Sequence, residues 1–186
     1  MVNVEKDENI LRRQYGTPKN LAARKSLRDF LVPRIDIHEK ALDSLNLKGH
    51  ESILDVGCGD GYVLYNLRQE RNHKGRLVGI DMNAGMFEEI NKFQKKTKLP
   101  QIELIVGNAE SLPFPDKSFD VVTAFFMLYH VSDLEKVLSE FKRVLKKDGK
   151  LLIATMGVEN RKDFETLRPD YIVRKSSFSL ETGGEF

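Results

Sequence analysis

The chain has 186 residues, of which 40% are hydrophobic and 31% charged, and this suits one globular domain with a sizeable core. Lysine and arginine number 30 against 28 aspartates and glutamates, and this near-balance disfavours nucleic acid or a membrane as the principal partner. The single cysteine, Cys58, cannot form an internal disulfide, and the sequence has neither a signal-peptide pattern nor an apolar run of membrane-spanning length. We therefore expect a cytoplasmic protein.

The first 50 residues have a helical pattern, and a strand–helix alternation follows them. One amphipathic segment contains Leu21, Leu27, Phe30 and Leu31, and a second covers residues 35–47. From about residue 52, short apolar runs predict strands at 52–56, 76–80, 102–106, 120–126 and 150–155. Helical periodicity between these runs predicts helices at 62–71, 83–96 and 132–147.

The last of these helices has the clearest pattern in the sequence. Ser132 and Glu135 have the spacing of a capping box. An apolar stripe follows, with Lys146 and Lys147 in the predicted last turn and Gly149 just beyond it. These signals predict both ends of the helix.

The order of the elements predicts the fold class. Repeated strand–helix–strand units with nearly continuous apolar strands are typical of a parallel sheet covered by helices on both faces. We therefore expect an α/β, Rossmann-like, doubly wound sheet of five parallel strands within a single domain. In this domain, residues 1–50 form a helical cap, residues 51–157 form the core, and residues 158–186 are a tail without an assignable pattern.

A glycine cluster follows the first predicted strand, in the run Asp55-Val56-Gly57-Cys58-Gly59-Asp60-Gly61. A glycine-rich turn before a helix allows a ligand to approach the backbone closely. Here the spacing is GxGxG. The dinucleotide fingerprint GxGxxG requires a third glycine where this chain has Tyr62.

The charges in this loop also bear on the ligand. Asp55 and Asp60 would repel a pyrophosphate and attract a ligand that carries a sulfonium and an ammonium group, which favours S-adenosylmethionine over a nicotinamide cofactor. Asp81 ends the second predicted strand, where a carboxylate can accept both ribose hydroxyls. Because both S-adenosylmethionine and a nicotinamide cofactor contain a ribose, Asp81 does not distinguish between these two ligands.

Five segments of the core resemble class I S-adenosylmethionine-dependent methyltransferases in order and spacing. They cover about residues 50–157 and read ILDVGCGDGY, GIDMN, GNAESLPFPDKSFDVV, FFMLYHV and VLKKDGKLLIAT. The likeness is greatest to the small-molecule branch that includes the ubiquinone/menaquinone-type methyltransferases.

The resemblance implies a set of cofactor contacts. Asp55 and the glycine loop, with Gly57, Cys58, Gly59 and Gly61, would hold the methionine part, and Asp81 would hold the ribose. Met82 would lie against the adenine, and the Asn108-Ala109-Glu110 loop would read its edge. Asn108 departs from the family, which usually has an acid there, although an amide oxygen can still accept from the adenine amino group.

Several of these residues also have a purely structural interpretation. Cys58 is a small residue that fits a tight turn, Met82 and Leu112 can be core residues, and His130 suits packing better than general-base catalysis. Tyr15 and Arg24 lie in the segment that often covers the cofactor in this family. The sequence contains no convincing general base and no metal-ligand cluster. It therefore gives almost no information about the methyl acceptor.

The resemblance implies seven strands, the last two forming an antiparallel hairpin at one edge, whereas the sequence predicts five. An open fifth strand would allow a homo-oligomer to form through that edge. Two alternatives to a methyltransferase acting on a small molecule therefore stay open. One is a truncated, non-catalytic module that binds S-adenosylmethionine or S-adenosylhomocysteine; the other is a nicotinamide-dependent oxidoreductase.

Overall fold

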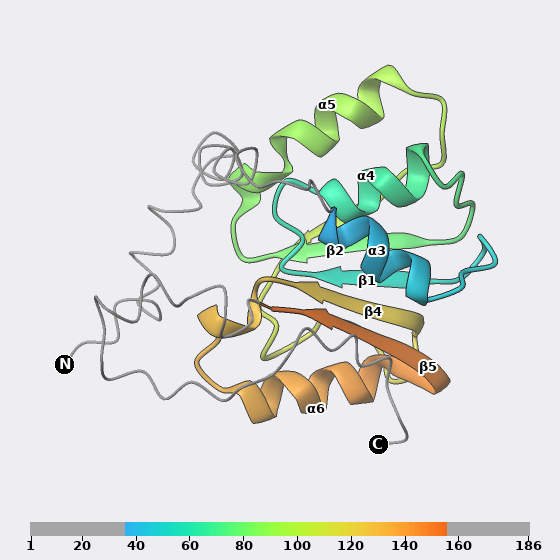
Figure 1. The fold of residues 1–186 in the computed structure, drawn as a ribbon. Helices are drawn as coiled ribbons and strands as arrows, with labels where there is room; N and C mark the ends of the chain where they lie inside the picture. The colour runs from blue at the N-terminus through green and yellow to red at the C-terminus, as the bar shows by residue number, and fades with distance from the viewer. Residues whose placement is uncertain (1–35, 156–186) are drawn as a thin grey trace, which may run out of the picture.

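A computed structural model describes residues 36–155, which form a parallel sheet with helices on both faces (Figure 1). Tyr15, Arg24, the expected helix around 21–31 and the tail 158–186 lie outside the described residues. The elements in chain order are α3 (Ile37–Ser44), β1 (Ile53–Val56), α4 (Tyr62–Gln69), β2 (Leu77–Asp81), η3 (Ala84–Phe87), α5 (Glu88–Lys96), β3 (Glu103–Val106), β4 (Phe119–Phe125), η4 (Leu128–His130), α6 (Leu134–Val144) and β5 (Leu145–Ala154).

The five strands are all parallel and follow the order β3-β2-β1-β4-β5. The predicted five-stranded, doubly wound architecture is therefore confirmed. β1 lies at the centre, where Ile53 pairs with Leu77 of β2 on one side and with Val121 of β4 on the other. All four residues of β1 are buried, as a nearly continuous apolar run in a parallel sheet predicts.

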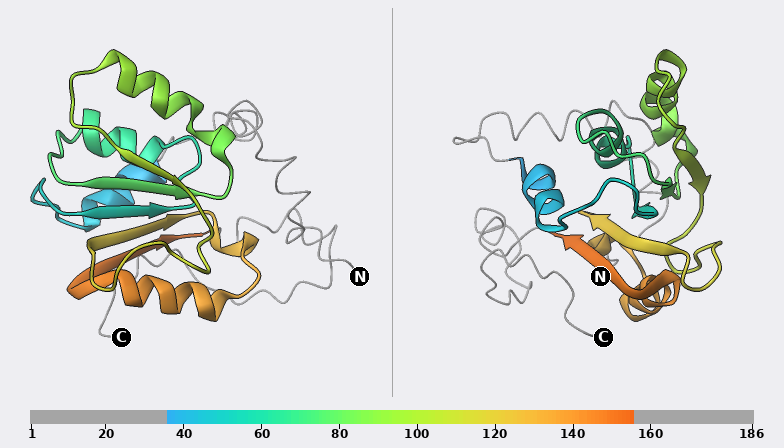
Figure 2. Two further views of the ribbon diagram at one scale, coloured as in Figure 1. Left: turned by 180° about the vertical axis from the view of Figure 1, so that it is seen from behind. Right: turned by 90° about the vertical axis from the view of Figure 1, so that its right-hand side faces the viewer.

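Helices cover both faces of the sheet (Figure 2), and an apolar cluster lies on each face. Helices α3, α4 and α5 cover one face, where Leu42 and Leu64 pack with Ile53. Helix α6 and residues 109–114 cover the other face, where Phe141 packs with Leu54. Because both faces are covered, the strands β2 and β4, which flank β1, are buried along most of their length.

The two ends of α6 differ from the sequence prediction. The N-cap is Asp133 instead of Ser132: its backbone is extended and its carboxylate accepts the Lys136 N–H at 3.0 Å. A carboxylate at this position also benefits from the positive end of the helix dipole, which explains why it prevails over the neighbouring hydroxyl.

Helix α6 also ends earlier than the sequence analysis predicted. It stops at Val144, and Leu145 is extended and bridges to Phe119 of β4. Lys146, Lys147 and Gly149 therefore belong to the irregular start of β5, and regular pairing begins at Lys150, where the sequence placed the strand.

The remaining helices differ from prediction mainly in length. α3 lies within the expected 35–47 segment and begins after the N-cap Asp36, whose carboxylate accepts the His38 and Glu39 N–H groups. The helix expected over 83–96 is divided into η3 and α5. Within residues 36–155, no helix is long and apolar enough to cross a membrane.

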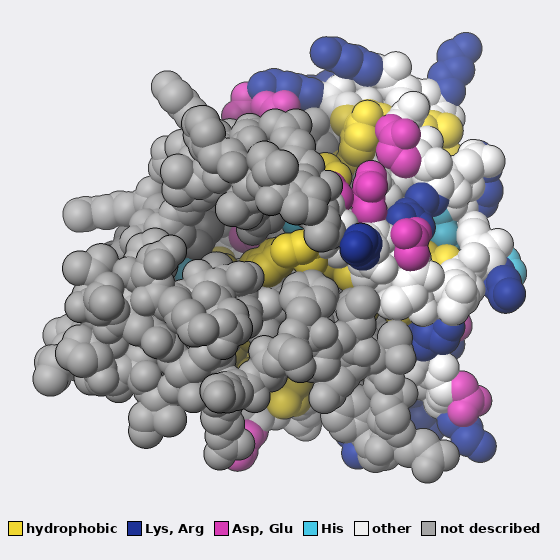
Figure 3. Space-filling model, viewed as in Figure 1, with side chains coloured by type: hydrophobic (Ala, Val, Ile, Leu, Met, Phe, Trp, Pro, Cys, Tyr) yellow, Lys and Arg dark blue, Asp and Glu magenta, His cyan; other side chains and the backbone are white. Residues whose placement is uncertain are grey.

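Charged side chains of both signs are interspersed on the face shown in Figure 3. Lys92 on α5, for example, contacts both Glu88 and Glu89. This pattern fits the near-balance of charge in the sequence.

Candidate functional site

The carboxyl ends of the strands bring the predicted site residues to one edge of the sheet. The connections from β1 lead outward through β2 to β3, whereas β4 and β5 lie on the opposite side of β1. Ligands of open α/β sheets bind where the strand order reverses in this way. The loop after β1, residues 57–61, lies at this reversal point.

The glycines of this loop serve packing as well as backbone conformation. Gly57 has φ +67°, and a Cβ added to it would come within 2.7 Å of the Met127 side chain. Gly61 has φ +78°, and its added Cβ would come within 2.4 Å of Ile90 on α5. Both glycines thus allow another part of the protein to approach the loop closely. The sequence analysis had explained these glycines by the close approach of a ligand instead.

Asp81, at the end of β2, fixes the loop through both of its carboxylate oxygens. One oxygen accepts the Gly59 N–H and the other the Asn83 N–H, each at 2.9 Å. Burial raises the pKa of this carboxyl group, although the two N–H donors act in the opposite direction. Because each oxygen has a second lone pair, Asp81 can still accept hydroxyl groups of a ribose.

Asp55 lies deeper, within β1, and is only 2% exposed. Its Oδ1 accepts the Thr123 hydroxyl of β4 at 2.7 Å. Burial raises the pKa of Asp55 to about 7, assisted by the negative charges of Asp81 and Asp60 and opposed by the Thr123 hydrogen bond.

Cys58 points inward toward β2, because a Cβ added to Gly79 would meet its sulfur at 2.8 Å. Burial, together with Asp55 and Asp81, holds the pKa of this thiol well above its usual range. A thiol that stays protonated is a poor nucleophile, which agrees with a packing role.

The expected adenine residues occupy different environments. Met82 is 41% exposed, although it is apolar, and it directly follows Asp81. The Asn108 Oδ1 accepts the Glu110 N–H at 2.9 Å and so closes a turn. The Ala109 side chain is buried in the core with Leu112.

The Glu110 side chain contacts the start of α6. Its Oε1 accepts the N–H groups of Ser132 and Asp133, at 2.9 and 3.1 Å. The Glu110 side chain therefore holds the loop after β3 to the start of α6, a contact that the sequence analysis did not predict.

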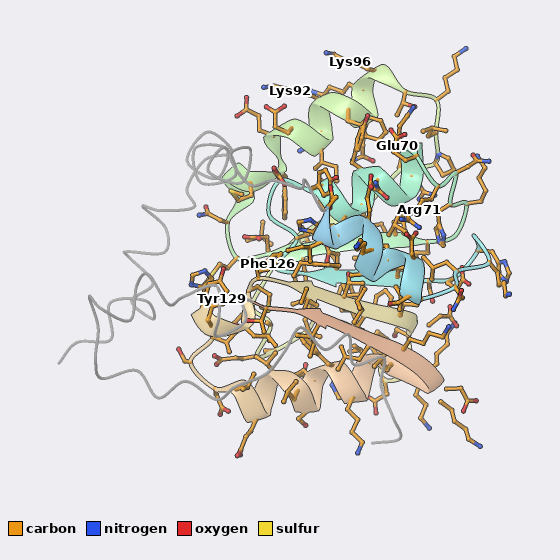
Figure 4. The ribbon with its side chains drawn as sticks, in the orientation of Figure 1. Glu70, Arg71, Lys92, Lys96, Phe126 and Tyr129 are labelled. Carbon is orange, nitrogen blue, oxygen red and sulfur yellow. The ribbon has the colours of Figure 1, made fainter. Side chains whose placement is uncertain are left out.

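A half-buried apolar and aromatic segment, residues 126–130, adjoins the glycine loop. It follows β4 and contains Phe126, Met127, Leu128, Tyr129 and His130, of which Met127 packs on Gly57. Figure 4 shows Phe126 and Tyr129 at the end of the sheet where the strands terminate, away from Glu70 and Arg71. Phe126 has φ +54°, a costly conformation for a bulky residue that often marks functional sites.

Two contacts near the site were missed by the sequence analysis. Thr123 could have been noticed as a polar residue inside an apolar strand, whereas nothing in the sequence marks Met127 as the neighbour of Gly57. The His130 ring lies against that of its neighbour Tyr129, at 4.2 Å between centroids. Among residues 36–155, no group of acids, histidines or cysteines could hold a metal.

Comparison with known proteins identifies the family. A family model described as a methyltransferase domain matches residues 54–153, which is more than half of the chain. The chain belongs to the methyltransferase domain family. The cofactor that this membership implies is S-adenosylmethionine, and the carboxylates around the glycine loop suit its cationic groups.

The relatives of this methyltransferase domain include proteins named methyltransferases and a solved structure with another name. The demethylmenaquinone methyltransferase of Oceanobacillus iheyensis is 36% identical over 58% of this chain and 45% of its own length. A solved SAM-dependent methyltransferase from Aquifex aeolicus is 29% identical, with a TM-score of 0.63 over 76% of this chain and 75% of that one. A [4+2]-cyclase, SpnF, is 28% identical, with a TM-score of 0.57 over 63% of this chain and 43% of that one.

The chain spans less than half the length of the curated relatives it matches.

Proposed function

We propose that this chain transfers the methyl group of S-adenosylmethionine to a small-molecule acceptor. The observation that carries the proposal is the family match over residues 54–153, together with a GxGxG loop surrounded by carboxylates. S-adenosylmethionine supplies an activated methyl group on sulfur, so the protein's task is chiefly to align the acceptor and exclude water.

The proposed cofactor contacts divide the site by chemistry. Asp55 and the loop residues Gly57, Cys58, Gly59 and Gly61 surround the methionine part. Asp81 accepts the ribose hydroxyls, for which each of its oxygens retains a lone pair. Exposed Met82 covers one face of the adenine, and the turn at Asn108 and Ala109 contacts its edge.

The acceptor site that we propose is the segment 126–130. Its half-buried apolar and aromatic side chains adjoin the cofactor loop through the Met127–Gly57 contact, and they suit a flat apolar ring. Several relatives are named demethylmenaquinone methyltransferases, and such a name is compatible with an acceptor of this kind.

The test uses S-adenosylmethionine labelled in its methyl group, with 1,4-naphthohydroquinone as the first acceptor probe and a low-molecular-weight cell extract as the second. Label in an organic-soluble product, reduced in Phe126→Ala but not in the distant variant Glu70→Ala, supports the proposal. Binding of the cofactor without label transfer to either source would favour a cofactor-binding protein that performs no methylation. The fold also occurs in a protein named a [4+2]-cyclase.

A further inference from the structure

We propose that Asp55 distinguishes S-adenosylmethionine from its demethylated product by taking up a proton when the positive charge on sulfur is lost. This inference rests on the proposed function, since it requires both ligands to bind at the glycine loop. It assigns to Asp55 a role in discriminating charge, beyond that of a cofactor contact.

The surroundings of Asp55 make its charge sensitive to a bound cation. The carboxyl group is 2% exposed, and the charges that act on it are those of Asp81 at the end of β2 and Asp60 in the glycine loop. The Cys58 thiol is the neighbouring titratable group on which Asp55 itself acts. The two acids repel a negative charge on Asp55, and the thiol stays neutral. Within the part of the chain that the structure describes, no lysine or arginine is among these groups. A ligand cation is therefore the available source of compensation.

The Thr123 hydroxyl can form a hydrogen bond with Asp55 whether Asp55 is ionised or protonated. The Thr123 Oγ1 lies 2.7 Å from the Asp55 Oδ1 and 3.4 Å from the Leu54 carbonyl oxygen. When Asp55 is ionised, the hydroxyl donates to the carboxylate. When Asp55 is protonated, the carboxyl group donates to Oγ1, and the hydroxyl hydrogen turns to the Leu54 carbonyl.

Proton uptake can therefore occur with only small displacements of heavy atoms. Burial places the pKa of Asp55 at about 7 in the ligand-free protein, so both protonation states are populated near neutral pH. A sulfonium in the loop favours the carboxylate, since an opposite charge lowers the pKa of an acid. Both ligands carry the same ammonium group, so they differ at Asp55 only in the charge on sulfur. After methyl transfer the sulfur is a neutral thioether, and Asp55 takes up a proton from the solvent.

The first test counts protons in the unmodified protein. Each ligand is titrated calorimetrically at pH 7 in two buffers of different ionisation enthalpy. Binding of S-adenosylmethionine should release up to about half a proton more than binding of S-adenosylhomocysteine, because a group with a pKa of about 7 is half protonated at that pH in the ligand-free protein. This measurement does not depend on whether any variant folds.

The second test compares dissociation constants. Between pH 6 and pH 8, the preference for S-adenosylmethionine over S-adenosylhomocysteine should increase by up to about tenfold, because ionised Asp55 binds the cation better. Asp55→Asn should make this ratio independent of pH. Asp116→Asn makes the same chemical change on an exposed residue that pairs with Arg143, and it should preserve the wild-type dependence.

The outcomes separate this inference from the function on which it rests. Equal proton release for both ligands, or a pH-dependent ratio that survives in Asp55→Asn, would overturn the role of Asp55 and leave the cofactor assignment intact. If neither ligand binds, both proposals are wrong.

Discussion

Two carboxylates beside the glycine loop, of Asp81 and Asp55, have different hydrogen-bond donors. Asp81 accepts two backbone N–H groups, and these hold the loop in place. Asp55 accepts a hydroxyl that can also turn to another acceptor. Asp81 is therefore suited to fixing loop geometry, whereas Asp55 is suited to responding to charge.

The pKa of Asp55 predicts how stability depends on pH. The folded protein binds a proton at Asp55 up to about pH 7, whereas the unfolded chain releases it near the ordinary value of 3.8. The stability contributed by the protonated group is thus fully present below about pH 4 and is lost as pH rises through 7.

Asp55→Asn should remove this dependence. Relative to the wild type, the variant should gain about 2.5 kcal/mol in free energy of unfolding between pH 5 and pH 8, measured with urea. Burial lowers the pKa of His73 and gives an opposite trend in the same range, but this trend is common to both proteins and cancels in the difference. A difference that does not vary with pH would show that Asp55 is ionised throughout.

Asn108 offers a second test at a single residue. Its Oδ1 closes the turn by accepting the Glu110 N–H, and an aspartate can keep that bond while presenting a charged acceptor to the adenine amino group. Because hydrogen bonds to charged groups exceed neutral ones by about 1 kcal/mol, Asn108→Asp should bind S-adenosylhomocysteine with unchanged or up to about tenfold higher affinity. Asn108→Leu should bind it more weakly. Calorimetric affinity at least tenfold weaker in Asn108→Asp would mean that Asn108 donates to the ligand.

At the scale of elements, the start of α6 provides a paired test of capping. Asp133→Ala removes the acceptor for the Lys136 N–H and should lower the free energy of unfolding by about 1 kcal/mol. Ser132→Ala should be nearly neutral, because the Ser132 contact with Glu110 uses its backbone N–H. If urea denaturation found the larger loss in Ser132→Ala, the sequence-based capping box would be correct and Asp133 would not be the cap.

The outer strand β5 leads to a prediction about assembly. Leu151 and Leu152 are buried on opposite faces of the sheet, and β5 is an outer strand of the sheet that residues 36–155 form. Since open strand edges invite pairing, we expect either self-association or coverage of β5 by residues 158–186. Sedimentation and amide exchange would contradict both if they found a monomer whose tail and β5 amides exchange freely.

The strands could be predicted from the sequence more accurately than the helix ends. Apolar runs such as residues 76–80 mark buried parallel strands directly, and β2 differs from that run by one residue at each end. The end of α6 depended on where the chain must turn back to pair with Phe119. That tertiary requirement prevails over the lysines and glycine, which locally favour a longer helix.

At the scale of the whole molecule, the sequence predicts which residues gather at the candidate site but not the contacts among them. The GxGxG run and Asp81 could be placed at the carboxyl edge because a parallel sheet brings these strand ends together. The pairing of Asp55 with Thr123 and the packing of Met127 on Gly57 join residues about 70 apart in the chain. Neither contact leaves a periodic signal in the sequence.

The most direct test of the assignment compares the thermal stability of the chain with saturating S-adenosylhomocysteine or NADH. A ligand that binds only the folded state stabilises it by about 2.7 kcal/mol at a hundred times its Kd, so S-adenosylhomocysteine should raise the Tm by at least about 5 °C. Asp81→Ala, which removes the loop anchor and the proposed ribose acceptor, should lose most of that ligand-induced shift. Stabilisation by NADH and none by S-adenosylhomocysteine would contradict the assignment of the cofactor.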